Sequence, residues 1–590
     1  MLPVRKTSGR VGRRLSMLPA RLPWIRTQVG WADVVVAATV LVVFYVAIRV
    51  GAGVAVSFTP SRPLHIDTDP TKLPYYAVRS LLRMFAALAV SVVFTLVYGY
   101  AAARSRRLER VLIPALDILQ SVPILGFLTI AVTTLVGLFP HSLLGLELAA
   151  VFAIFTSQAW NMTFSFYHSL ITLPRELDEL SRNLRLTRWM RFWRIEVPHA
   201  AIGLVWNGMM SFGGGWFFLV ASEAITVANH EYTLPGVGAY AGTAIANGNL
   251  AGIGYAIATM TIMVVAVNFM FWRPLTAWVE KFKQEQSEAV DVPRSLVLDL
   301  LRRSHWPQFI APAKRAAAEA LGRIGRVFGT DDQALSARPV RRRAGDVAFN
   351  VAMLGLLAWG VVEVVRYLHG SGEGLGVFTE PLLLGLLTLT RVVVLMLVAT
   401  VVWVPIGVRI GLSPRLARVA QPVVQVLASF PANFLFPLVT WLLVHTGISL
   451  DIGGVLLMAL GAQWYILFNT IAGAQAIPTD LREAMTDLGV RGRQRWRRLI
   501  IPAVFPYYVT GGITASGGAW NASIVAEVVT FGGTTLTAHG LGAYIAEATN
   551  AGNYPKVLAG IAVMSLYVVG LNRLFWRRLY TLAVTRYALT

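Results

Sequence analysis

The chain of 590 residues contains no cysteine, so disulfides, thiol catalysis and cysteine-ligated metals are excluded. It also contains no Gly-Lys dipeptide, and therefore no G-x-x-x-x-G-K-[ST] loop of the kind that cradles nucleotide phosphates. No Ser/His/Asp or paired-carboxylate pattern points to catalysis. His141, His230 and His539 stand singly, without the spacing of metal ligands. We predict neither catalytic nor metal-binding residues.

Charge is scarce as well. Only 14% of the residues are charged and 56% are hydrophobic, with a mean hydropathy of +0.60, a balance typical of membrane proteins. The formal net charge of +22 raises the possibility of a nucleic-acid partner. Lysine and arginine are, however, concentrated in the short stretches between apolar runs, which is the positive-inside pattern. We therefore expect a lipid bilayer around the chain and no nucleic acid.

The apolar runs predict an all-α polytopic fold with about twelve spanning helices, since each crossing needs roughly 20 residues. The first run lacks a small-residue cleavage site, so we interpret it as a retained helix rather than a signal peptide. Six spans per half are expected, near 31–54, 79–103, 112–138, 146–168, 200–228 and 251–273, and near 346–369, 382–411, 420–446, 453–475, 504–530 and 556–575.

The distribution of arginine orients these spans. The basic stretches all fall on one side of the membrane if both termini are cytoplasmic. They lie at 5–26, 104–110, 175–194, 409–418, 482–498 and 577–578. A loop on the opposite side, 57–72, is poor in positive charge and contains Asp67 and Asp69.

The segment from Pro174 to Leu275 recurs in the second half of the chain. Subtraction of residue numbers gives an offset of 304 for Trp216 and Trp520, and the same offset for Glu223 and Glu527. The offset also relates Gly236-Val-Gly-Ala-Tyr240 to Gly540-Leu-Gly-Ala-Tyr544. The chain therefore consists of two copies of one membrane unit. Such repeats typically form a translocation route at their interface.

A polar connector joins two cytoplasmic ends, so the copies have the same orientation and form parallel repeats. We divide the chain into a basic cytoplasmic tail (1–30), a first transmembrane domain (31–275), the connector (276–345) and a second transmembrane domain (346–590). Within the connector, Lys314–Phe328 has the pattern of an amphipathic helix. Two interpretations are open for it: it lies on the cytoplasmic leaflet, or it docks onto a cytoplasmic partner.

A charged stretch lies between the fourth and fifth spans of each copy. In the second copy, residues 478–502 predict a helix, a break at Gly489 and a further helix ended by Pro502. This stretch resembles the EAA motif of binding-protein-dependent ABC importer permeases. The residues that match are Glu483, Ala484, Gly489 and Pro502.

The first copy retains Glu179 and Pro198 but has Leu180-Ser181 in place of Ala-Ala and Arg185 in place of glycine. Arginine adopts the left-handed backbone region at a cost that glycine does not have. We therefore expect the break at Arg185 to differ in geometry from the break at Gly489.

The wider pattern resembles the nitrate/taurine branch of these permeases. It rests on Gly214-Gly215-Trp216 with Glu223, on their counterparts 518–527, and on the Gly-x-Gly-Ala-Tyr loops. The resemblance implies a type I importer fold in a bacterial inner membrane and a small anionic solute such as nitrate, a sulfonate or bicarbonate. It also implies that the EAA segments are coupling helices bound by two copies of a cytoplasmic ABC ATPase, which carry ATP and Mg, and that an extracytoplasmic protein delivers the solute.

Candidates for the translocation route occur at matching positions of the two copies. We expect Trp216, Phe217, Trp520 and Asn521 on the cavity wall, although small neighbouring residues that allow close helix approach give an alternative explanation. Intramembrane acids are functional candidates, so Glu223 and Glu527 either line the route or clamp their own helices. The prolines within the third span of each copy, Pro123 and Pro431, either line the cavity or merely bend the helix.

Three other functions compete with this one. A twelve-helix secondary transporter driven by an ion gradient would have charges buried in its spans and no need of coupling helices. A membrane-embedded enzyme would have a cluster of polar ligands within the spans, and we identify none from the sequence. Export is the third alternative. The two EAA-like segments favour the ATP-driven importer.

Overall fold

The structure is a computed structural model that describes residues 31–51, 65–121, 124–140, 142–184, 186–227, 230–279, 281, 296–304, 339–531 and 534–587. The expected N-terminal tail and the expected amphipathic helix Lys314–Phe328 lie outside these ranges. Within them the chain is almost entirely helical, apart from two short β-hairpins.

The first half contains eleven α-helices and one hairpin among its described residues. In chain order these are α1 (Trp31–Gly51), α2 (Leu73–Arg104), α3 (Arg106–Ser121), α4 (Ile124–Leu138), α5 (Leu144–Ile171), α6 (Arg175–Asn183), α7 (Arg188–Arg191), α8 (Val197–Glu223), β1 (Ala224–Val227), β2 (His230–Thr233), α9 (Val237–Ala246), α10 (Leu250–Val267) and α11 (Arg273–Val279). Single π-turns precede α8 and α11, at Phe192–Glu196 and Asn268–Trp272.

After α12 (Leu296–Arg303), the second half repeats this order. Its elements are α14 (Pro339–Gly370), α15 (Thr379–Gly411), α16 (Pro414–Ser429), α17 (Phe436–Thr446), α18 (Leu450–Gln475), α19 (Thr479–Asp487), α20 (Gly492–Arg495), α21 (Ile501–Ala526), β3 (Val528–Phe531), β4 (Thr534–Thr537), α22 (Leu541–Asn550), α23 (Tyr554–Leu571) and α24 (Arg577–Arg586). The π-turns recur as well, at Trp496–Ile500 and Asn572–Trp576.

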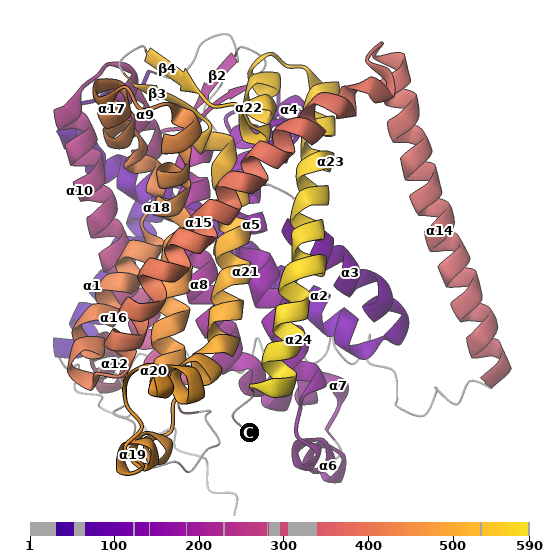
Figure 1. Ribbon diagram of the computed structural model, residues 1–590, viewed down its shortest axis with the longest axis vertical. Coiled ribbons are helices and arrows are strands. Elements are labelled where there is room, and N and C mark those ends of the chain that lie inside the picture. Colours follow the sequence, from indigo (N-terminus) through magenta and orange to yellow (C-terminus); the bar gives the residue numbers. More distant parts are fainter. Residues whose placement is uncertain are drawn as a thin grey trace, which may run out of the picture.

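The two repeats run in the same direction through the molecule. Both α6 and α19 project from one end of the bundle, and both hairpins lie at the opposite end with α9 and α22 (Figure 1). The hairpins are antiparallel and in the same register, with Ala224 opposite Thr233 and Val528 opposite Thr537. The all-α fold of two parallel repeats is therefore confirmed.

Eight helices within the described residues are long and apolar enough to cross a membrane. Among the other predicted spans, α5 has sufficient length but contains Glu147 and Gln158. The predicted third span is two helices in the second half, α16 followed by α17; in the first half, α3 and α4 lie on either side of residues 122–123, which are outside the described ranges.

The proline explains this interruption in the second half. Pro431 lies between α16 and α17 with an extended backbone (φ −68°, ψ 111°), so the prediction of one helix with a proline inside it is wrong there. The residue before it, Phe430, is also extended (φ −71°, ψ 129°), as a residue preceding proline prefers. Pro123 lies outside the described residues.

Two other predicted boundaries are wrong as well. The fifth spans were expected to reach residues 228 and 530, but α8 ends at Glu223 and α21 at Ala526. In both halves the chain then turns into a hairpin whose strands are rich in β-branched residues, namely Ala224-Ile-Thr-Val227 and Val528-Val-Thr-Phe531.

Glycines bring the two halves into close contact on one side. A methyl group on Gly213 of α8 would lie 2.7 Å from the hydroxyl oxygen of Ser429 in α16. A methyl group on Gly214 would lie 3.2 Å from the hydroxyl of Tyr465 in α18. The matching glycine of α21, Gly517, has nothing within 4 Å of that position. The interface between the halves is therefore closed on the α8–α16 side and less tightly packed at Gly517.

Candidate functional site

A buried cluster of charges joins the helices of the first half near its hairpin end. The guanidinium of Arg83, in α2, donates to both oxygens of Glu147, in α5, at 2.5 and 2.7 Å. Its remaining nitrogen donates to Glu223, the last residue of α8, at 2.7 Å. Arg79, one turn earlier in α2, also pairs with Glu147. One arginine thus links three helices.

The second half contains the same arrangement. Arg391 in α15 donates to Glu527 at 2.8 Å and to Asp451, in α18, at 2.6 Å. Subtraction relates Arg83 to Arg391 by 308 positions and Glu147 to Asp451 by 304. The second acid has a different additional partner, because His539 Nδ1 lies 3.1 Å from Asp451 where the first half uses Arg79.

Each of the two glutamates has further donors around it. Glu223 accepts hydrogen bonds from the hydroxyl of Ser80 at 2.6 Å and from the backbone N–H of Gly238 at 2.7 Å. Glu527 accepts the equivalent bonds, both at 2.8 Å, from Thr388 and from Gly542. The backbone donors belong to the first turns of α9 and α22, where the helix dipole favours a negative charge.

These contacts explain why the Gly-x-Gly loops contain glycine. A methyl group on Gly236 would overlap the carboxylate of Glu223, and one on Gly540 would overlap that of Glu527. Only glycine leaves room for the carboxylate to lie against the start of the following helix. We call each set of contacts a clamp: Arg79, Ser80, Arg83, Glu147, Glu223 and Gly238 in the first half, and Thr388, Arg391, Asp451, Glu527, His539 and Gly542 in the second.

Glu223 and Glu527 both have 0% exposed surface, and both carboxylate oxygens of each residue accept hydrogen bonds. A carboxylate on an open route would need accessible surface. Of the two interpretations that the sequence left open for Glu223 and Glu527, the contacts support the clamp. The sequence predicted no polar cluster within the spans, and this prediction is wrong. Arginines inside the apolar helices α2 and α15 were the signal for it.

Three of the residues expected on the cavity wall hold helices together. Trp520 is 1% exposed and stacks on Tyr567 within its own half, with ring centroids 6.0 Å apart. Asn521 accepts a hydrogen bond at 2.8 Å from the backbone N–H of Ile124, the first residue of α4 in the other half. The carbonyl of Phe217 accepts a long hydrogen bond, 3.4 Å, from Asn433.

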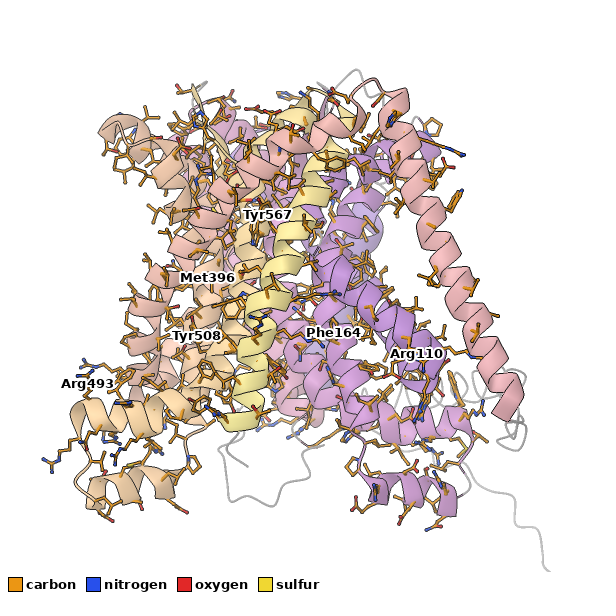
Figure 2. The ribbon with its side chains drawn as sticks, turned by 45° about the vertical axis from the view of Figure 1, so that its right-hand side comes forward. Arg110, Phe164, Met396, Arg493, Tyr508 and Tyr567 are labelled. Carbon is orange, nitrogen blue, oxygen red and sulfur yellow. The ribbon has the colours of Figure 1, made fainter. Side chains whose placement is uncertain are left out.

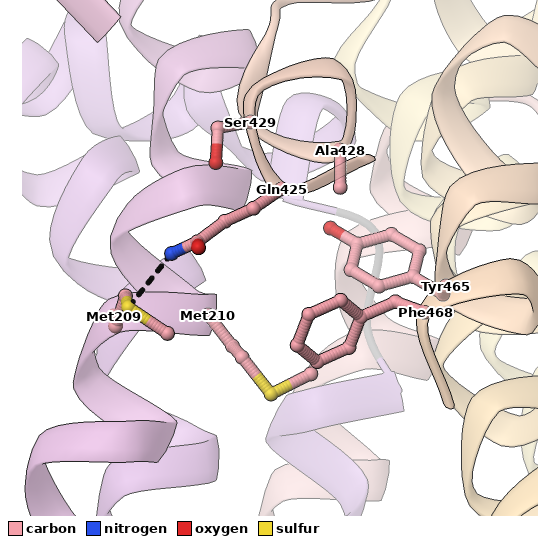
Figure 3. Close-up of a pocket in the computed structure, with 7 residues that line it drawn as sticks. All are labelled: Met209, Met210, Gln425, Ala428, Ser429, Tyr465 and Phe468. Atoms are coloured by element: carbon pink, nitrogen blue, oxygen red, sulfur yellow. Dashed lines mark hydrogen bonds between the residues drawn. The ribbon is translucent and has the colours of Figure 1, made fainter. Parts of the chain in front are cut away.

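A small cavity of about 30 Å³ lies between the halves (Figure 3). This is room for one or two water molecules. Its wall combines α8 of the first half with α16 and α18 of the second, through Met209, Met210, Gln425, Ala428, Ser429, Tyr465 and Phe468. A neighbouring void of about 10 Å³ shares Met209, Gln425 and Ser429 and includes Trp216, the one predicted wall residue found on it.

Within the cavity, Gln425 is held from the first half. Its side-chain nitrogen donates to the sulfur of Met209 at 2.9 Å and to the side-chain oxygen of Asn268 at 3.1 Å. Gln425 and Tyr465 were not predicted as site residues, because uncharged polar side chains in a span give only a weak signal.

The first charged segment, α6 with α7, is braced by ion pairs. Asp178 lies 2.8 Å from Arg182 and 2.7 Å from Arg191. Arg191 also lies 2.8 Å from Glu196, which pairs with Arg104 at the end of α2. These bonds connect α6 to the main bundle. Glu179 itself is exposed, and Pro198 is half-buried.

The second charged segment, α19 with α20, ends its first helix as the sequence predicts. Gly489 has a left-handed backbone (φ 67°). Val490 N–H donates to the Met485 carbonyl at 2.9 Å and Gly489 N–H to that of Thr486 at 3.0 Å, the pattern of a Schellman motif. Glu483 and Ala484 are exposed. Among the described residues, no ion pair braces α19 as Arg191 braces α6.

Arg185 lies outside the described residues, so the expected difference in backbone geometry there stays a prediction. The hydrogen bond that spans it, from Leu186 N–H to the Ser181 carbonyl at 3.0 Å, is equivalent to that from Val490 to Met485. Both charged segments therefore close their first helix with the same long-range bond.

One detail of this segment was predicted wrongly. Pro502 was expected to end the second helix, but it lies in the first turn of α21, and Pro198 lies in the first turn of α8. Proline is tolerated in a first turn. The π-turns that precede α8 and α21 join them to α7 and α20 without a break. In Figure 2 the two segments project separately from the bundle, with Arg493 at the start of α20.

Comparison with known proteins identifies the family. The family model described as "Binding-protein-dependent transport system inner membrane component" matches twice, at residues 85–273 and 403–578. The chain belongs to this family. It is a multi-pass permease, the transport subunit of such a system, with two family domains fused in one chain.

Relatives of this permease have about half its length. It is 29% identical over 219 residues to the nitrate import permease protein NrtB of Leptolyngbya laminosa, covering 37% of this chain and 72% of the relative. The taurine transport system permease protein TauC of Escherichia coli is 25% identical (30% and 62%). The putative aliphatic sulfonates transport permease protein SsuC of Bacillus subtilis is 27% identical (42% and 90%).

No group of three or more histidine or acidic side chains within the described part of the permease could hold a metal ion. The buried acids are satisfied by arginine, by hydroxyls and by backbone N–H groups instead.

The clamp generates a direct prediction. Glu527→Gln leaves Arg391 with one carboxylate and should destabilise the permease by roughly 3–5 kcal/mol, as breaking a buried ion pair does. Folded yield and thermal unfolding in detergent measure this.

The matched control is Glu363→Gln, which removes the exposed 2.9 Å pair with Arg366 on α14 and should cost about 0–1 kcal/mol. A Glu527→Gln permease with wild-type stability but no transport would instead place Glu527 on the route.

Proposed function

We propose that the chain forms the translocation pathway of an ATP-driven importer for a small anionic solute, like the nitrate and aliphatic sulfonates named for two of its relatives, and that α6–α7 and α19–α20 couple it to separate ATPase subunits. The observation that carries this proposal is the repeated projecting segment at one end of each half. Two copies of one docking element suit two copies of one partner.

The surfaces of these segments support docking. Leu180 and Leu184 of the first segment are 46% and 60% exposed, and Leu488 of the second is 77% exposed. These side chains lie beyond the apolar helices, beside charged neighbours, where lipid does not cover them. Apolar residues exposed together on a projecting element indicate a protein interface.

The expected partners follow from the missing phosphate loop and from the orientation that we assign to the chain in the membrane. Without a phosphate loop of its own, the permease needs two ABC ATPase subunits that carry ATP and Mg. They would bind at the α6–α19 end, which we assign to the cytoplasm of a bacterial cell together with both termini. A solute-binding protein would dock at the opposite end, beside the hairpins.

The clamps suit such a mechanism. Each ties α2, α5 and α8, or their counterparts, into one body, so that movement of a coupling segment is transmitted along the half. Rocking of one half against the other would open the cavity alternately to the two sides.

A secondary transporter driven by an ion gradient is the alternative. Buried charges do occur in the spans, as that function would require. However, the glutamates of both clamps are fully paired, which leaves neither of them free to exchange a proton or ion. This pairing favours the ATP-driven importer.

Reconstitution tests the proposal. In proteoliposomes with its co-expressed ATPase and binding protein, the permease should accumulate solute only when ATP is present. Taurine and nitrate are suitable first probes. An ATPase variant lacking its phosphate-loop lysine should abolish uptake, since hydrolysis drives the movement. Uptake that continues with the inactive ATPase and follows an imposed ion gradient would establish the alternative.

The two coupling segments should respond differently to substitution. Gly489→Val places a β-branched residue in a left-handed conformation and should distort the end of α19. We expect it to lower the solute transported per ATP hydrolysed. The comparison variant is Arg185→Val, at the matching position, and it should have the smaller effect. Equal losses of coupling in the two variants would contradict the proposed asymmetry.

A further inference from the structure

The chemistry of the cavity between the halves narrows the class of solute, and this inference rests on the proposed function. We propose that the cavity lined by Met210, Gln425, Ser429, Tyr465 and Phe468 becomes the solute site when rocking of the two halves enlarges it beyond the one or two waters it can hold here. It takes an organic solute with an apolar body, rather than a compact inorganic anion such as nitrate.

None of the seven residues around the cavity is charged. Met209, Met210, Phe468 and the ring of Tyr465 offer apolar contact, while polar contact comes from the Gln425 amide and from the hydroxyls of Ser429 and Tyr465 (Figure 3). Sites for organic ligands typically have this composition, with mainly apolar walls and a few polar groups that fix orientation.

The matching positions of the opposite side do not supply a positive charge either. The repeat offsets of 304 and 308 relate Tyr465 to Asn161, Phe468 to Phe164 and Met210 to Thr514. They relate Ala428 to Gln120, Ser429 to Ser121 and Gln425 to Asp117. No lysine, arginine or histidine occurs in this second set. Gln120 donates to the side-chain oxygen of Asn161 at 3.2 Å, so two of its polar groups already meet.

The two sets are unequal in polarity. Of the six matched residues around the cavity, three are apolar (Met210, Ala428 and Phe468), whereas of their six counterparts in the sequence only Phe164 is apolar. A route between the two sets would have a more apolar wall on the α8–α16–α18 side and a more polar wall at Gln120, Asn161 and Thr514. An organic solute with a polar head and an apolar body fits such a route on both sides.

A compact anion would not be stabilised there. Removing an unpaired charge from water is expensive, and anion pores offset that cost with arginine or lysine. Arg83 and Arg391 are engaged in the clamps and have at most 6% exposed surface. Nitrate has no apolar surface that could compensate by contact with methionine and phenylalanine.

The absence of cysteine allows a test without knowledge of the solute. Single variants Ser429→Cys and Met210→Cys, with Thr514→Cys for the opposite wall, are expressed as the full-length permease with its ATPase. Each variant is treated, in membranes and during ATP turnover, with one of two thiol reagents. These are the anionic sulfonatoethyl methanethiosulfonate and the cationic trimethylammonioethyl methanethiosulfonate. For each thiol, the reaction rate with the anionic reagent is divided by the rate with the cationic reagent. This ratio, divided by the same ratio for free 2-mercaptoethanol, reports the charge around the thiol.

We expect all three thiols to react and none of them to favour the anionic reagent, since no fixed cation faces them. A lipid-exposed control, Ile262→Cys on α10, should not react with either charged reagent; its side chain is 68% exposed. Ser429→Cys is nearly isosteric, so a folding defect is not expected, and size-exclusion profiles verify this.

Two results would overturn the inference. A preference for the anionic reagent of roughly tenfold or more would reveal a positive site suited to a compact anion. Failure of all three thiols to react, in a complex that transports solute, would remove the cavity from the route. The second result would leave the proposed import function intact, whereas loss of ATP-driven uptake in the unmodified complex would overturn that function instead.

Discussion

The bond network between one buried arginine and two carboxylates organises each half of this molecule. Charges at this depth are tolerated only when they are paired, so Arg83 and Arg391 hold their partners firmly. Through Glu147 and Asp451 they bind the helix pair α2–α5 or α15–α18. Through the glutamates they bind the end of α8 or α21 and the start of the helix after each hairpin.

The two clamps differ in the groups that pair with their acidic side chains. The first has two arginines, Arg79 and Arg83, opposite two glutamates. The second has one arginine for two acids, and the backbone N–H and imidazole of His539 on Asp451 supply the missing donors. The same architecture is thus stabilised by slightly different means. Fusion into one chain allows such divergence, because each half needs to fit only one partner.

Divergence is greatest where movement is expected. The first charged segment, α6 with α7, is braced by Arg191, while the second, α19 with α20, has left-handed glycines at Gly489 and Gly492 with nothing within 4 Å of their side-chain positions. The interface between the halves is also unequal, with Ser429 against Gly213 and open space at Gly517. The first segment is held by ion pairs, and the second contains two left-handed glycines. We therefore expect the two halves to have different roles in one transport cycle.

The sequence predicted much of this and missed the rest for identifiable reasons. Apolar runs and the offset of 304 sufficed for the repeats, their direction and the projecting segments. The clamps were missed because Arg83 and Glu223 are 140 residues apart, and because the arginines repeat at 308 rather than 304. The hairpins after Glu223 and Ala526 continue apolar sequence, so no change of composition marks the end of the helix. The break at Pro431 depends on the extended backbone of Phe430, which the sequence only hinted at.

The central claim is that each half moves as one body held by its clamp. Spin-label distances test it directly, because the chain has no cysteine to interfere. Labels at Glu179→Cys and Glu483→Cys report the separation of the projecting helices α6 and α19. A second pair, at Glu179→Cys and Asn247→Cys, spans the first half across its clamp. On ATP binding by the partner ATPase, the first distance should change and the second should stay constant. A second distance that changes as much as the first would contradict the account.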